Sequence, residues 1–353
     1  MISYWQQEDG KLTKVNQNTL NPNKNTWVDA RCVTRDDIVE LEETYNIDSE
    51  TMLDILDPDE LSRIEKNEDN GSTLIILRLP VFAPGDDVSY FTAPLGIIIS
   101  GRKLITICWT DCEVLKDFSA NRIKELTLND LPAFTIRFMA RADVLFLRYL
   151  KELNRRATTI QNEMLRSVQS SELVQLLNIQ KSLVYFSTSL KSNQMLLEKL
   201  RKTKFIRLDE EDQDWIDDVE IDNRQAMEMA DTYTNIMAQM NDASASLISN
   251  NLSIVMKRMT IISIVIAIPT FITSFFGMNI PLPWMHSGWL GISLISLICF
   301  ISALVGWYFI SKSSKTAGRV KSTKKRKSPK QIKAEKKQMK FIKKQDKLAG
   351  LIK

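Results

Sequence analysis

The sequence has very little histidine and lacks the short motifs with which enzymes hold phosphates or activate nucleophiles. Its one histidine among 353 residues, His286, lies between two long apolar runs. There is no Gly-rich phosphate loop and no nucleophile elbow. Because histidine is the most frequent general acid or base in catalysis, we expect no enzymatic activity.

Cysteine is also scarce, and its spacing does not favour a metal site. The four cysteines are Cys32, Cys108, Cys112 and Cys299. Cys108 and Cys112 are four positions apart, which is not the spacing of a zinc knuckle. The polar N-terminal segment has no apolar core of a cleavable signal peptide. These observations predict reduced thiols in a cytosolic domain.

Glycine and proline are missing from a long central stretch. Neither occurs from Ala133 to Ile268, a run of 136 residues rich in good helix formers. We expect helices over about 132–167 and 170–204, and a third from near Asp214 to Phe276. The third helix is so long that it needs partners, or copies of itself, to pack against.

The first 130 residues have a different pattern. Five short β-branched or apolar runs bounded by Gly, Pro, Asn and Asp predict strands. Between them, residues 34–47 predict a helix capped by Thr34, and residues 49–65 a second helical stretch interrupted at Pro58. Strands with intervening helices predict an α/β domain.

Two uncharged apolar runs near the C-terminus, Met259–Phe276 and Trp289–Ile310, are each long enough to cross a membrane as a helix. Lys and Arg flank the pair on both outer sides but are absent from the connector 277–288. The positive-inside rule then places both termini in the cytoplasm. A buried helical hairpin of a soluble protein is the alternative, which the uncharged length and the aromatic residues at the ends disfavour.

Charge is divided unevenly along the chain. From Ser311 onward there are 17 Lys and Arg against two acids, which leaves 30 basic and 41 acidic residues in the rest. The acidic body suits cations and the basic tail suits anions. We expect the tail either to lie on anionic lipid or to be disordered. No nucleic-acid partner is expected.

The acids are densest at the start of the third long helix. Residues 209–222 hold nine carboxylates and no base. A helix N-terminus favours one or two acids through its dipole, but nine repel one another. Bound cations would relieve that repulsion, so both a solvated helix start and a cation site remain open.

Small and polar residues form a stripe along the first apolar run at spacings of three and four. The stripe consists of Ser253, Met256, Met259, Thr260, Ser263, Ala267, Thr270 and Ser274. In lipid such a stripe faces either other helices or a water-filled lumen. One hairpin cannot enclose a pore, so pore lining would require a homo-oligomer.

The connector opens with Gly277, Met278 and Asn279. In an oligomeric pore, Asn279 would form a ring of amide groups at the outer mouth. A helix C-cap with Gly277 just past the last turn is a second reading, and the two are compatible.

This arrangement resembles the CorA family of magnesium transporters. The Gly-Met-Asn tripeptide follows a first span and precedes a short connector and a second span, after a long helix without breakers. The segments 249–262 and 52–65 are also similar. The resemblance covers about residues 25–311 and leaves the basic tail outside it.

The resemblance implies roles for particular residues. Asn279 would bind the ion, with Gly277 and Met278 holding its geometry. Thr270 would face the pore, and Met256 and Met259 would form a hydrophobic constriction. The remaining implied residues are regulatory metal ligands, namely Asp54 with Asp218 of a neighbouring subunit, and Asp242.

The resemblance also implies an assembly and an activity. Family members are homopentamers, so we expect a pentameric channel in the plasma membrane. The channel would carry Mg²⁺, with cobalt and nickel as further candidate ions, and would close when intracellular Mg²⁺ binds between subunits. A zinc-transporting relative and a non-conducting cation sensor remain alternatives. The expected divisions are an α/β domain (1–130), a helical stalk (131–252), two spans (253–276 and 289–311) joined by the connector (277–288), and a basic cytoplasmic tail (312–353).

Overall fold

The computed structural model describes residues 1–67, 71–85, 87–124, 126–164, 170–202, 210–278 and 288–317. The chain forms two compact units, an N-terminal unit from Met1 to Ala245 and a C-terminal unit from Ser246 onward. Helix α6, Glu210–Phe276, contributes to both.

A seven-stranded sheet forms the centre of the N-terminal unit, in the order β2-β1-β3-β7-β6-β5-β4. The pairing of β3 with β7 is parallel, and the other neighbours are antiparallel. The strands are β1 (Ile2–Glu8), β2 (Lys11–Val15), β3 (Thr26–Arg31), β4 (Arg63–Lys66), β5 (Thr73–Phe82), β6 (Tyr90–Ser100) and β7 (Lys103–Cys108).

The sheet is covered on both faces, and β5 shows why. Ile75, Leu77 and Leu79 point into one apolar core, while Leu74 and Ile76 point into the other. Successive side chains of a strand lie on opposite faces, so an almost continuously apolar strand needs a cover on each side.

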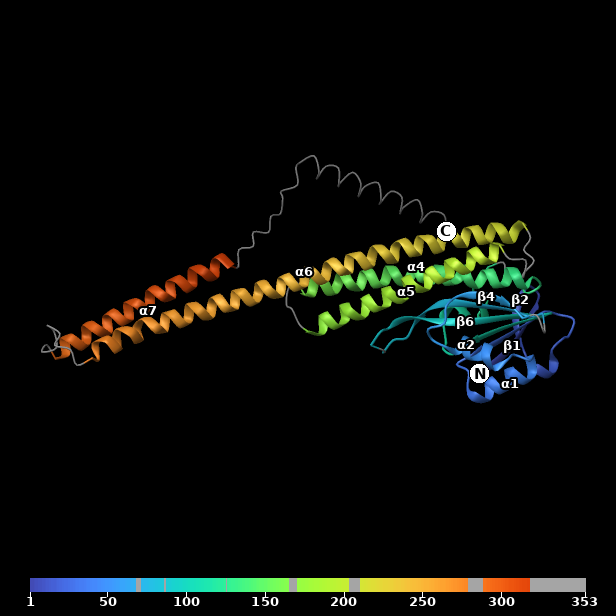
Figure 1. Cartoon of the computed structure of the whole chain (residues 1–353), viewed down its shortest axis with the longest axis horizontal. Helices are drawn as coiled ribbons and strands as arrows, with labels where there is room; N and C mark the ends of the chain where they lie inside the picture. The colour runs from blue at the N-terminus through green and yellow to red at the C-terminus, as the bar shows by residue number, and fades with distance from the viewer. Residues whose placement is uncertain are drawn as a thin grey trace, which may run out of the picture. The chain divides into compact units, whose positions relative to one another are not determined.

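Helices supply the two covers (Figure 1). On one face lie α1 (Arg35–Tyr45) and α2 (Ser49–Leu56), which contribute Leu41, Met52 and Ile55 to that core. Gly96 of β6 allows the close approach of α2, because a Cβ there would stand 2.6 Å from side-chain atoms of Ile55.

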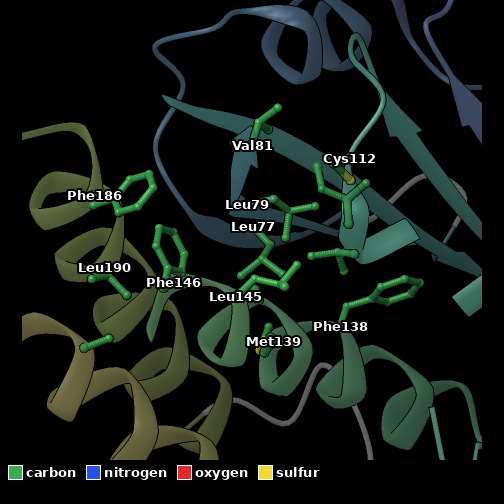
Figure 2. Packing of buried hydrophobic residues seen from close by; sticks show 14 of the residues in the cluster. Leu77, Leu79, Val81, Cys112, Phe138, Met139, Leu145, Phe146, Phe186 and Leu190 are labelled. Carbon is green, nitrogen blue, oxygen red and sulfur yellow. The ribbon is translucent and has the colours of Figure 1, made fainter. Parts of the chain in front are cut away.

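The larger core lies on the other face. It is built from α3 (Glu113–Ser119), α4 (Leu131–Met164), α5 (Ser170–Lys202) and the first part of α6. Figure 2 shows Phe146 of α4 and Phe186 of α5 beside the β5 side chains, with their rings edge to face at 5.2 Å. Each such aromatic ring removes a large apolar area from water.

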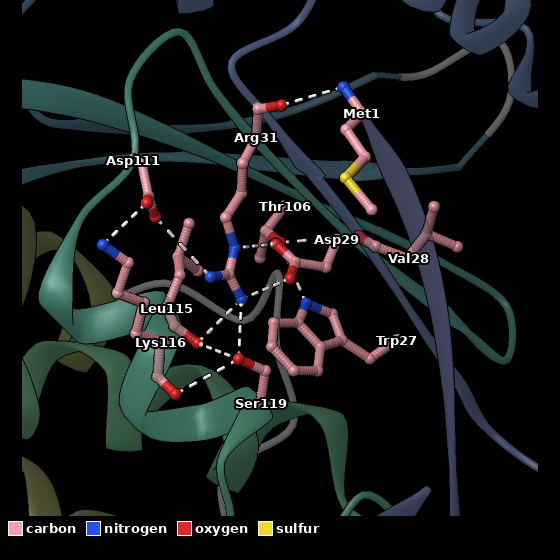
Figure 3. Close-up of polar contacts among 10 residues, drawn as sticks. All are labelled: Met1, Trp27, Val28, Asp29, Arg31, Thr106, Asp111, Leu115, Lys116 and Ser119. Carbon is pink, nitrogen blue, oxygen red and sulfur yellow. Dashed lines mark hydrogen bonds and ion pairs between the residues drawn. The ribbon is translucent and has the colours of Figure 1, made fainter. Parts of the chain in front are cut away.

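A buried charge network closes one end of this core. Figure 3 shows the Arg31 guanidinium between Asp29 of β3 and the carbonyl of Leu115 on α3, with Ser119 also in reach. Burial raises the pKa of the Asp29 carboxyl, and the hydrogen bonds from Arg31 oppose that shift. The network ties the parallel strands to α3.

The predicted helices are confirmed, with ends within a few residues of those expected. Thr34 caps α1 in a capping box with Asp37. One part of the expectation was wrong: the helical stretch does not resume after Pro58. Instead α2 ends at Leu56 and residues 63–66 form β4, because they pair with β5 at the sheet edge.

Candidate functional site

Among the described residues, one helix is long and apolar enough to cross a membrane. It is α6, whose apolar part lies in the C-terminal unit. The second predicted span falls on α7 (Trp289–Ala317). Its apolar stretch within the described residues, Ile292–Tyr308, is shorter than that of α6. That second span stays a prediction.

The two helices of the C-terminal unit, α6 and α7, lie side by side (Figure 1). Ile261 and Val265 of α6 line a cavity together with Ser302 and Gly306 of α7. Along α6 the less exposed side chains recur at Ile261, Val265 and Pro269. This face is apolar and already has a partner.

The predicted stripe lies on the other side of α6. All eight residues are exposed in the single chain. Counted at about 100° per residue, each lies within about 60° of the line opposite Val265. The stripe is therefore free to line a lumen or to meet another copy.

The hydroxyl groups of the stripe are held by the helix itself. Thr260 donates to the Met256 carbonyl, Ser263 to Met259 and Thr270 to Ile266, at 2.8–3.0 Å. A hydroxyl that donates to the preceding turn keeps its lone pairs for another donor. These oxygens can therefore accept from water, and from the hydration shell of a cation.

The Gly-Met-Asn segment is described only in part. The Gly277 amide donates to Thr273 and the Met278 amide to Phe275, which prolong the last turn of α6. Gly277 does not take the left-handed conformation of a glycine cap. A Cβ there would stand 3.2 Å from the Thr273 carbonyl oxygen, which is tight. Asn279 lies outside the described residues.

Asp54 lies on the last turns of α2 and is paired. Its Oδ2 accepts from the Arg63 guanidinium at 2.6 Å, and the side chain is 40% exposed. Arg63, at the start of β4, also meets Glu60 and Glu65. Sequence reasoning missed this cation, because Arg63 stands nine positions away and reads as an ordinary surface residue.

Asp218 and Asp242 are exposed on α6. Asp217 and Glu220, next to Asp218, both pair with Arg201. Within the described ranges no hydrogen bond or ion pair engages Asp218. Its carboxylate therefore projects outward, available to a ligand from outside the chain.

One chain does not bring the predicted metal ligands together. Asp54 stands on α2, which packs on one face of the sheet, whereas α6 belongs to the opposite face through Ile216 and Val219. In the part of the chain that the structure describes, no group of three or more acids, cysteines or histidines could hold a metal ion. A shared site would need a second copy.

Sequence reasoning also missed a buried acid between α4 and α6. Asp143 is 2% exposed, and burial, with a smaller effect of the Asp222 charge, raises the pKa of its carboxyl well above the usual range. Beside Asp222, Asn223 is fully buried and donates to Leu190 and Gln194 of α5. An acid within an amphipathic helix gives no signal of burial.

Together, the fold and the exposed polar stripe define a class: an α/β unit whose last helix continues into a membrane-length apolar segment with a helical partner. A sequence profile described as CorA-like Mg2+ transporter protein matches residues 22–315. The chain belongs to that family. "Cobalt/magnesium transport protein CorA" of Methanocaldococcus jannaschii is 24% identical over 314 residues, which is 85% of this chain and 97% of that protein.

Solved structures share the fold. The complete structure of the CorA magnesium transporter from M. jannaschii has a TM-score of 0.70 at 22% identity, covering 88% of this chain and 96% of that one. The ZntB cytoplasmic domain from Vibrio parahaemolyticus has a TM-score of 0.54 at 12% identity, covering 70% and 97%. At these identities the likeness concerns the fold alone.

Proposed function

We propose that the chain forms a homopentameric channel that carries Mg²⁺ across the plasma membrane, with cobalt and nickel as further substrates. The observation that carries the proposal is the placement of the stripe on α6. Its eight residues lie opposite the face that packs on α7, so a ring of copies can turn them toward a common axis. Family membership supports the choice of ion.

The chemistry of the lining suits a hydrated cation. Mg²⁺ gives up its water shell reluctantly, and the hydroxyl oxygens of Thr260, Ser263 and Thr270 can accept hydrogen bonds from that shell. Rings of Met256 and Met259 would close the path by excluding water. At the outer mouth, a ring of Asn279 amide oxygens would receive the ion without stripping it.

Intracellular Mg²⁺ would also regulate the channel. Asp54 of one subunit and Asp218 of its neighbour would share the ion, with Asp242 as a second acidic position. Carboxylate oxygens are the ligands a hard cation prefers. A large exposed apolar side chain lies near Asp54 and another near Asp218. Leu53, beside Asp54, is 71% exposed, and Ile221, three positions after Asp218, is 63% exposed. Such residues favour an interface at both places.

The direction of ion transport follows from the charge of the ion and the membrane potential. Both termini would lie in the cytoplasm, and the basic tail would reinforce that topology or rest on anionic lipid. An inside-negative potential then drives a divalent cation inward with about 4.6 kcal/mol per 100 mV. Loss of internal Mg²⁺ would remove the ion that joins neighbouring subunits and would favour the open state.

Uptake of Mg²⁺ into liposomes that enclose a Mg²⁺-sensitive dye tests the proposal. The wild type should conduct, Asn279→Ala should abolish uptake, and Asn16→Ala, in a loop of the N-terminal unit, should not change it. Uptake untouched by Asn279→Ala would overturn the ion site, and zinc outcompeting magnesium would favour a zinc transporter. No uptake of any divalent ion by intact pentamers would leave a non-conducting sensor.

A further inference from the structure

Arg63 stands among three carboxylates. Its guanidinium contacts Asp54 at 2.6 Å and Glu60 more closely, and its Nε lies 2.9 Å from Glu65. The approach of Glu65 is near enough for an ion pair but is not aligned as a hydrogen bond. One guanidinium therefore pairs with three carboxylates, and the cluster carries a net negative charge.

The protein fixes the loop that leads to Arg63 through buried contacts. Arg78 of β5 donates to the carbonyls of Pro58 and Glu60, which pins the loop between α2 and β4. Ser62, directly before Arg63, donates from its backbone to Ser192 of α5. Because these groups are buried and satisfied, they hold the loop in one arrangement. The loop therefore keeps Arg63 beside Glu60 and Glu65.

Asp54 is the member of the cluster that can turn away. Its side chain is 40% exposed, and it lies near the C-terminal end of α2, where the helix dipole disfavours a negative charge. A neighbouring cation therefore stabilises its charge. Glu60 and Glu65 remain with Arg63 if Asp54 departs, so releasing Asp54 does not leave the guanidinium unpaired.

We propose that Arg63 is a built-in competitor of Mg²⁺ for the Asp54 carboxylate. This inference rests on the regulatory role of Asp54 given under the proposed function. In the Mg²⁺-free state Arg63 neutralises Asp54. When Mg²⁺ enters, the carboxylate leaves the guanidinium for the ion, and Arg63 stays with Glu60 and Glu65.

The exchange sets the Mg²⁺ concentration at which the regulatory site fills. Since the ion must displace Arg63, the apparent affinity of the site for Mg²⁺ is reduced. The reduction equals the factor by which the Arg63–Asp54 ion pair is favoured over the separated side chains. A partly exposed pair is worth up to ~1 kcal/mol, about a fivefold change in affinity. Arg63 thus shifts the half-saturating concentration upward by about that factor.

Limited proteolysis of the full-length protein in detergent tests the exchange, because a ligand of the folded state protects it in proportion to occupancy. Chymotrypsin is suitable, since none of the variants changes its cleavage sites. Arg63→Gln should lower the Mg²⁺ concentration for half-protection by about fivefold. The matched control Arg155→Gln removes a 77% exposed arginine that pairs only with Glu152 among the described acids, and should leave that concentration unchanged.

The outcomes separate this inference from the function on which it rests. Asp54→Asn should abolish protection by Mg²⁺; if protection persists, the regulatory site is not at Asp54 and both fail. If Asp54→Asn abolishes protection but Arg63→Gln leaves the half-protecting concentration unchanged or raises it, only the competition is overturned. If Arg155→Gln shifted the half-protecting Mg²⁺ concentration equally, the shift would reflect only the loss of a positive charge anywhere on the protein. That result would also overturn the competition by Arg63. A misfolded Arg63→Gln protein would not gain affinity for Mg²⁺.

Discussion

Gly306 of α7 lies directly against Val265 of α6. A Cβ added to the glycine would stand 2.5 Å from one valine methyl and 3.0 Å from the other. The contact therefore depends on the missing side chain of Gly306, because a small residue lets two helices approach closely. It fixes which face of α6 meets α7, and so which face carries the polar stripe.

Replacing Gly306 should disturb this packing. We expect Gly306→Ala to destabilise the protein by about 1–3 kcal/mol through overpacking, measured as a lower melting temperature in detergent. Val265→Ala in the same chain should restore most of the loss, because it returns the space. If the double variant is as unstable as the sum of the single changes, the two residues do not interact.

The orientation of the stripe leads to a second prediction. Thr260 and Thr273 lie on one helix but about 140° apart around its axis. Thr260→Val replaces a lining hydroxyl with a methyl and should lower Mg²⁺ uptake by about fivefold or more, the effect of losing a hydrogen bond of about 1 kcal/mol at a rate-limiting position. Thr273→Val makes the same change off the stripe and should have little effect. Equal losses in both would contradict pore lining by this face.

Local signals in the sequence were enough to predict the helices. The breaker-free stretch predicted α4, α5 and α6, and the Thr34 cap marked the start of α1, because capping and propensity act within a few residues. The same reasoning failed after Pro58. Residues 63–66 form β4 because β5 offers an unpaired edge, which a window of sequence cannot reveal.

The site was predictable to a lesser extent. Spacing alone identified the stripe, since the helix period places its members on one face. The pair of Asp54 with Arg63 and the burial of Asp143 depend on how distant elements pack. No local pattern distinguishes such residues from solvated charges. The division expected near residue 130 falls within one compact unit, because α4 and α5 share a core with the sheet.

The Arg31–Asp29 pair of Figure 3 leads to a third prediction. Asp29 is 3% exposed, so Arg31→Met would leave a buried carboxyl without its cation. We expect a loss of about 3 kcal/mol in the free energy of unfolding, measured by denaturant titration of tryptophan fluorescence. Asp111→Asn removes the more distant, exposed partner of Arg31, at 3.7 Å, together with the exposed pair of Asp111 with Lys116 at 2.7 Å. It should cost less than about 1 kcal/mol. Similar losses of unfolding free energy in Arg31→Met and Asp111→Asn would show that the buried pair with Asp29 contributes no more than the exposed one.

Asp143 gives a prediction about pH. Burial raises the pKa of its carboxyl in the folded protein, so the folded state favours the protonated form. The stabilisation from this group is complete below the ordinary pKa of an aspartate, near ~4, and is lost as pH rises through the raised value. Asp143→Asn cannot ionise and should therefore be more stable than the wild type by ~2 kcal/mol at pH 8, with a smaller difference at pH 5.

Melting temperatures of the full-length protein at the two pH values measure that difference. Asp222→Asn is the matched control, because Asp222 adds to the raised pKa without being the buried group. It should stabilise the protein in the same direction at pH 8, and by less. A destabilised Asp143→Asn at both pH values would mean that the carboxylate is ionised and held by a cation in the folded state. The buried acid would then belong with the paired charges of this fold, rather than being the neutral group that its surroundings between α4 and α6 indicate.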